Sequence, residues 1–200
     1  YYVAGNHGLD RLAAYLTQVS PALAGLDSLR FDKLVGLEEY DIKLAQGGSF
    51  ISPQGQENVR PGVLLHPDYE VYHGTATGQN PALSELKSAG RSGQSGHVHR
   101  ASVVYGTNEA LGAHSWMTTP CGCTDVAGRA YLGQRRNYGW QQGFGIAFLS
   151  PDGRVQQQPV VTTGGFAAFE GLCIQGELDE SMPTAKNWLP DWWASSPFSG

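Results

Sequence analysis

Four of the six histidines lie in segments whose residue types could do chemistry. They lie at the predicted ends of strands, in the glycine-containing segments Gly-Asn-His-Gly, His-Gly and Gly-His-x-His: His7, His73, His97 and His99. Imidazole ligates Zn, Fe and Mn-type ions, and the amide oxygen of Asn6 suits harder cations. Glycine lets backbone and ligand approach closely. The pattern predicts loops that converge on one divalent-metal site, as strand-end loops do in open α/β sheets.

The other two histidines, His66 and His114, stand alone in the sequence. A lone histidine is most often a surface or hydrogen-bonded residue. We therefore expect no functional role for these two side chains.

The elements that must position the four histidines alternate between strands and helices. We expect strands at residues 1–4, 42–44, 50–51, 62–65 and 101–105, and one that ends at Tyr72. Apolar spacing predicts a helix over residues 9–19, and a small helix is expected near residues 34–37. Asn80 and Pro81 predict a helix start, and Gly90 its end. Residues 52–60 are expected to form a polar loop.

A β-hairpin is predicted near the end of the chain. Residues 144–149 and 155–161 are two strand-like runs, joined by the turn Ser-Pro-Asp-Gly. The whole chain is predicted to be one mixed α/β domain, residues 1–200, with residues 188–200 as a C-terminal arm.

In this order the histidine segments resemble the C-terminal part of a calcineurin-like metallophosphoesterase. That family has five ordered blocks, of which Gly5-Asn6-His7-Gly8 is similar to the third, with Gly8 where an acid is usual. His73-Gly74 is similar to the fourth, and Gly96-His97-Val98-His99 to the fifth. Residues 140–144, Trp-Gln-Gln-Gly-Phe, resemble phage-type and actinobacterial members. The resemblance implies a four-layer αββα β-sandwich flanked by helices.

The resemblance also implies a role for each residue. Asn6, His73 and His97 would ligate one divalent ion and His99 a second, with Mn, Fe or Zn as candidates. His7 would be catalytic, by donating a proton to the leaving oxygen. The implied function is hydrolysis of phosphomonoesters or phosphodiesters by two metals and a bridging hydroxide, with nucleic acid or a nucleotide among the substrate classes.

The first two blocks of the family, Asp-x-His and Gly-Asp-x-x-Asp, do not occur in the chain. They carry the bridging carboxylate and the first-metal ligands. Because the chain also opens at Tyr1, inside a predicted core strand, we expect an N-terminally truncated piece of such an enzyme, weakly active or inactive alone. The alternative is a binding or scaffold protein that keeps the fold without the chemistry. A third, weaker hypothesis is a structural metal site at Cys121 and Cys123.

Composition excludes some classes of protein. The chain has 200 residues and a formal net charge of −5, which argues against bulk-charge binding of nucleic acid. A basic groove would require five arginines to converge: Arg91, Arg100, Arg129, Arg135 and Arg136. Tyr138 and Trp140 could stack a base. No apolar run approaches the roughly 18 residues of a membrane span, and three cysteines predict no disulfide framework, so a reducing cytoplasm is expected.

Overall fold

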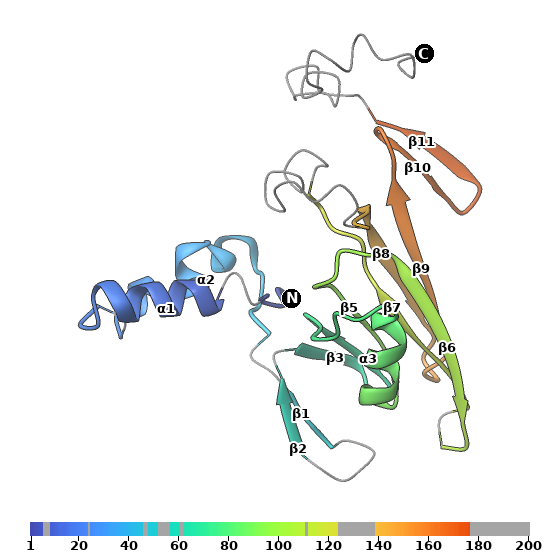
Figure 1. Cartoon of the computed structure of the whole chain (residues 1–200), viewed down its shortest axis with the longest axis horizontal. Helices are drawn as coiled ribbons and strands as arrows, with labels where there is room; N and C mark the ends of the chain where they lie inside the picture. Colours follow the sequence, from blue (N-terminus) through green and yellow to red (C-terminus); the bar gives the residue numbers. More distant parts are fainter. Residues whose placement is uncertain are drawn as a thin grey trace.

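The protein is a mixed α/β structure built around one five-stranded sheet (Figure 1). The computed structural model describes residues 1–5, 9–23, 25–45, 48–51, 57–60, 62–110, 112–123 and 139–176. The predicted α/β class is confirmed at this level. The predicted arm, residues 188–200, lies outside the described residues.

The five-stranded sheet has the order β3-β4-β5-β7-β6. Its strands are β3 (Gly62–His66), β4 (Tyr69–Tyr72), β5 (Ser92–Ser95), β6 (Ser102–Asn108) and β7 (Gly112–Thr118). β5 is parallel to both β4 and β7, whereas the β3–β4 and β6–β7 pairs are antiparallel. Parallel neighbours end at the same edge, so the residues after β4 and those after β5 are brought together.

Helix α3 (Pro81–Ala89) connects β4 to β5 and covers one face of the sheet (Figure 1). Gly90 ends it in the left-handed conformation, as predicted. Asn80 occupies the predicted N-cap position, but its side chain makes no capping hydrogen bond. The core beneath the helix is made of aromatic, aliphatic and small side chains: Tyr72, Ala82, Leu86, Ala89 and Trp116.

Gly93 in β5 is required by this packing. A methyl group there would lie 2.5 Å from the Trp116 ring and 2.5 Å from the carbonyl oxygen of Glu70. The tryptophan ring therefore occupies the space that any other residue at position 93 would need.

The predicted hairpin is confirmed and lies against the other face of the sheet. It consists of β8 (Gln142–Leu149) and β9 (Val155–Thr162). Gln157 ties it to the sheet, because its amide accepts a hydrogen bond from the buried Tyr69 hydroxyl (3.0 Å) and donates to the Ser115 carbonyl (2.9 Å). The buried Gln157 amide thus has hydrogen-bond partners for both its oxygen and its nitrogen, and these bonds join the hairpin to the sheet.

The remaining elements surround this body. They are α1 (Leu9–Val19), which matches the predicted helix, the short helices η1 (Asp27–Leu29), α2 (Phe31–Leu34) and η2 (Leu37–Tyr40), and the strand pairs β1 (Gly48–Ile51) with β2 (Glu57–Arg60) and β10 (Phe166–Phe169) with β11 (Leu172–Gln175). In Figure 1 the helices α1 and α2 lie to one side of the sheet, and β10–β11 extends beyond the hairpin. No helix among the described residues is long and apolar enough to cross a membrane.

Several predictions of elements are wrong. Residues 1–4 and 42–44 form no strands but a single parallel bridge, Tyr2 to Leu44, in which the Tyr2 ring also packs on Phe31 (5.4 Å between centroids). Residues 57–60, expected in a loop, pair with β1, because pairing with a neighbouring strand overrides weak local preference. The small helix expected at 34–37 is replaced by α2 and η2 on either side of it. Strands β5 and β7 were not predicted at all.

Candidate metal centre

His73 and His97 meet at the edge where β4 and β5 end. His73 directly follows β4, and His97 comes two residues after β5. Nε2 of His73 lies 3.1 Å from Nδ1 of His97, and the two rings are 5.0 Å apart at 75°. The structure therefore places two of the predicted metal ligands in direct contact.

The distance between these nitrogens suits a shared ion. Two nitrogens that are each about 2.1 Å from one cation lie about 3.0 to 3.4 Å apart, for bond angles between octahedral and tetrahedral. The observed 3.1 Å falls in that range. This spacing is compatible with a hydrogen bond between the two rings in the metal-free protein and with two positions on a divalent ion, with Nε2 of His73 and Nδ1 of His97 as the ligating atoms.

Two glycines allow this contact. A methyl group on Gly5 would lie 2.8 Å from Cε1 of His73, so Gly5 lies directly against that ring. Gly74 has φ +98, and a methyl group there would approach Ser95 at 3.0 Å and Cβ of His97 at 3.4 Å. The structure thus brings Gly5, the first residue of the Gly-Asn-His-Gly segment, and Gly74 to the histidine pair.

Asn6 and His7, the predicted third ligand and proton donor, lie outside the described residues. They follow Gly5 in the chain. The contact of Gly5 with His73 therefore places the start of their segment at the histidine pair.

The loop that carries His97 and His99 has an uncommon backbone. Both residues have positive φ angles, 65° and 57°, a conformation that few residues other than glycine adopt. Three hydrogen bonds hold the loop in this shape: Val98 N–H to Gly96 O (2.7 Å), Gln141 N–H to His99 O (2.9 Å) and Thr118 Oγ1 to Arg100 O (2.7 Å). Strained backbone that is held by its surroundings is commonest at functional sites.

His99, the predicted ligand of the second ion, packs against an aromatic ring. The His99 and Trp140 rings are 4.1 Å apart and 74° inclined. Trp140 was considered for stacking a nucleic-acid base, but its ring is here in contact with the histidine. Tyr138, the other candidate for stacking, lies outside the described residues.

The two histidines expected to be ordinary have local partners. His66 Nδ1 accepts a hydrogen bond from the Asp68 N–H (3.3 Å), in the turn between β3 and β4. His114 is near the carbonyl of Gly112 (3.1 Å). Both positions are compatible with turn and surface roles.

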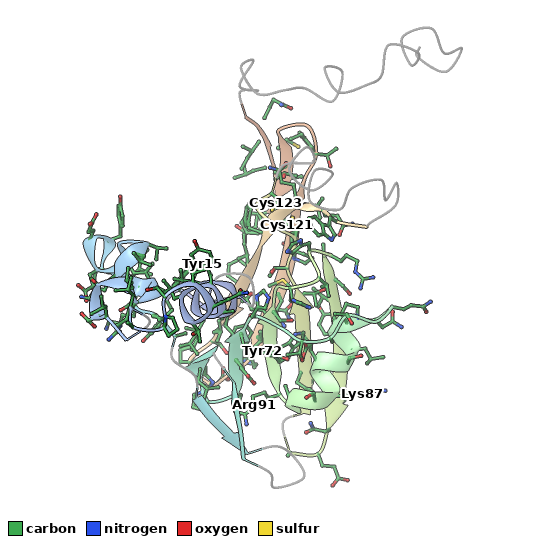
Figure 2. All side chains as sticks on the ribbon, turned by 60° about the vertical axis from the view of Figure 1, so that its left-hand side comes forward. Tyr15, Tyr72, Lys87, Arg91, Cys121 and Cys123 are labelled. Atoms are coloured by element: carbon green, nitrogen blue, oxygen red, sulfur yellow. The ribbon has the colours of Figure 1, made fainter. Side chains whose placement is uncertain are left out.

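Cys121 and Cys123 lie close together near the upper end of the hairpin in Figure 2. Both are free thiols. Burial raises the pKa of the Cys121 thiol, and a hydrogen bond with the Cys123 backbone offsets part of that rise. A raised pKa disfavours the thiolate that a metal would need.

The arginines in the described part of the chain do not form one groove. Arg91 precedes β5 and donates to the Pro67 carbonyl, while Arg100 lies at the other end of the sheet and donates to the Gly78 carbonyl. The other three arginines considered for a basic groove lie outside the described residues: Arg129, Arg135 and Arg136. Arg100 also lines a pocket of about 210 Å³, and among the described lining residues it is the only charged one.

The described residues supply only part of a metal-binding set. Within them, no three His, Cys, Asp or Glu side chains gather as ligands. The histidine pair thus needs further ligands, and Asn6 is the predicted third.

Sequence reasoning missed Glu85 beside this pair and considered Arg100 only for a basic groove. Glu85 and Arg100 bind the backbone of the loop that follows His73. Only the spatial proximity of α3 and the two loops reveals them, because no spacing in the sequence links position 85 to position 73.

The chain matches no family model, no curated protein and no solved structure.

Proposed function

We propose that the chain carries part of the active site of a metal-dependent phosphoesterase with a calcineurin-like fold. The observation that supports this proposal most directly is the 3.1 Å approach of Nε2 of His73 to Nδ1 of His97. It joins two segments that are 24 residues apart and that resemble consecutive blocks of that family. Gly5 and Gly74 leave the room that this approach needs.

In this proposal each residue has one task. His73 and His97 hold one ion together with Asn6, and His99 ligates the second. His7 gives a proton to the leaving oxygen, since imidazole titrates near neutral pH. Divalent ions supply positive charge at the phosphoryl oxygens and lower the pKa of water.

The test is hydrolysis of bis(p-nitrophenyl) phosphate and p-nitrophenyl phosphate by the full chain, with Mn²⁺ and then with EDTA. We expect weak activity that needs Mn²⁺, because the two carboxylate-bearing blocks do not occur in the chain. His97→Ala should abolish it. His114→Ala, at a half-buried position on β7, is the matched control and should not change it.

A binding or scaffold protein is the second candidate. It is favoured by the absence of a third His, Cys, Asp or Glu ligand among the described residues. Tight Mn²⁺ binding without any hydrolysis would support this candidate. Hydrolysis that persists in both EDTA and the His97→Ala variant would exclude the proposed enzyme.

A further inference from the structure

The loop that connects His73 to α3 is held from two sides. Its backbone amides at positions 75 and 76 point to Glu85 on α3, and its backbone carbonyls at positions 77 and 78 point to Arg100. Arg100 directly follows His99 in the other histidine loop.

Glu85 is a buried carboxylate, only 2% exposed. Its Oε1 accepts hydrogen bonds from the Thr75 N–H (2.7 Å) and the Ala76 N–H (2.8 Å), and its Oε2 accepts one from the Tyr72 hydroxyl. Tyr72 immediately precedes His73, so these contacts lie on both sides of the histidine. Figure 2 shows Tyr72 in the interior of the body.

Burying the Glu85 carboxylate costs desolvation free energy that an apolar side chain at the same position on α3 would not cost. An apolar side chain of similar size is often neutral or stabilising at such a position. The three hydrogen bonds of Glu85 go to Tyr72, Thr75 and Ala76, all within three residues of His73, so this carboxylate fixes the loop around the histidine.

Arg100 links the two histidine loops. Its Nη2 donates to the Gly78 carbonyl (2.7 Å) and, at longer range, to the Thr77 carbonyl (3.4 Å). Its own carbonyl is held by Thr118 (2.7 Å) in β7. A displacement of the loop after β5 would therefore be transmitted to the loop after β4 through the hydrogen bonds of Arg100.

We propose that Glu85 and Arg100 are positioning residues that clamp residues 75–78 and thereby keep His73 against His97. This proposal rests on the proposed function, because it assigns the clamp to the same metal centre. Neither side chain is assigned contact with substrate or metal. Residues that orient metal ligands typically change metal affinity about 10- to 100-fold when replaced.

The experiment uses Glu85→Gln and Arg100→Gln in the full chain, with Arg91→Gln as the matched control. Arg91 also donates to a backbone carbonyl, but at the opposite end of the sheet (Figure 2). Mn²⁺ affinity is measured by calorimetry, and the metal-free ring ¹⁵N resonances of His73 and His97 are recorded by NMR. We expect about tenfold weaker Mn²⁺ binding and loss of the hydrogen-bonded ring signature in both variants, but not in the control.

The two readouts separate the clamp from the proposed function. If the unaltered chain binds no Mn²⁺ while the ring resonances change as expected, the metal centre is wrong and the clamp stands. If the urea midpoints fall but the ring resonances and Mn²⁺ affinity do not change, both residues are merely structural and the clamp is overturned. If Glu85→Gln does not fold, Arg100→Gln decides the question, since its half-buried side chain lies outside the core.

Discussion

At each end of the central sheet a histidine ring lies close to a glycine, but in the described part of the chain only one of the two rings also contacts a second histidine. At one end, His73 lies under Gly5 and meets His97. At the other, His66 lies under Gly153 of the hairpin turn, and its ring accepts a hydrogen bond from Asp68 within its own turn. The difference comes from strand direction. β4 and β5 are parallel and deliver two histidine loops to one edge, whereas β3 and β4 are antiparallel and only close a turn.

The groups around a histidine therefore determine whether its ring can bind a ligand, since the residue type is the same at both ends. His97 and His99 lie on strained backbone with positive φ that three hydrogen bonds hold in place. The loop beyond His73 is bound through Glu85 and Arg100. The His66 turn has anchors of its own: Arg91 donates to the Pro67 carbonyl, and the Tyr69 hydroxyl donates to Gln157.

The largest expected effect is loss of metal binding at the His73 end. We expect His73→Ala to weaken Mn²⁺ binding by at least about 100-fold, because it removes a ligand itself rather than a group that orients one. His66→Ala should leave the affinity unchanged. Calorimetry of both variants measures this, and equal losses in the two would erase the distinction between the ends.

The next effect separates the two glycines. Gly5→Ala should reduce Mn²⁺ affinity about tenfold, because its methyl group would lie 2.8 Å from the His73 ring and displace it. Gly153→Ala should instead cost about 1 to 2 kcal/mol of unfolding free energy, since Gly153 has φ +85 and a methyl group there would lie 2.9 Å from His66.

Urea titration of both glycine variants measures the unfolding free energy, and calorimetry measures the Mn²⁺ affinity. A loss of metal affinity in Gly153→Ala, or a purely structural loss in Gly5→Ala, would contradict the comparison.

A smaller effect is expected at high pH at the His66 end. Burial raises the pKa of Tyr69 above its usual value near 10. The folded state therefore keeps a proton that the unfolded state releases, so stability is fully present below about pH 10 and falls as pH rises further.

Tyr69→Phe should flatten this alkaline decline, and near pH 7 it should cost about 1 kcal/mol through the lost hydrogen bond to Gln157. Urea midpoints between pH 7 and pH 11 measure both changes. An alkaline decline of the same slope in the variant would mean that other groups cause it.

The smallest effect is expected in the turn that carries Gly153. Hydrogen bonds from Ser150 and then from Arg154 lower the pKa of Asp152. The carboxylate thus stabilises the turn above the usual pKa of aspartate, and this contribution disappears as pH falls through the lowered value.

Because Asp152 is fully exposed, Asp152→Asn should change the thermal midpoint at pH 7 only slightly and leave Mn²⁺ affinity unchanged. A large change in the thermal midpoint or in the Mn²⁺ affinity would show that Asp152 stabilises parts of the fold beyond this turn.

Local sequence signals specify several elements of this fold. Apolar spacing specified α1, turn residues specified the hairpin, and Gly90 specified the end of α3. The sequence also marked His73 and His97 as ligand candidates, because each stands beside glycine where a strand ends. The contact of the two rings was predicted only in outline, as a convergence of loops.

The central strand β5, and the contacts that depend on it, follow from tertiary pairing. β5 has the sequence Ser-Gly-Gln-Ser, which has little intrinsic preference for a strand. It becomes one because β4 and β7 pair with it on both sides and because Gly93 leaves room for the Trp116 ring. This pairing sets the 3.1 Å distance between the histidines and brings Glu85 and Arg100 to one loop. Such contacts join residues far apart in the chain, and no local pattern encodes them.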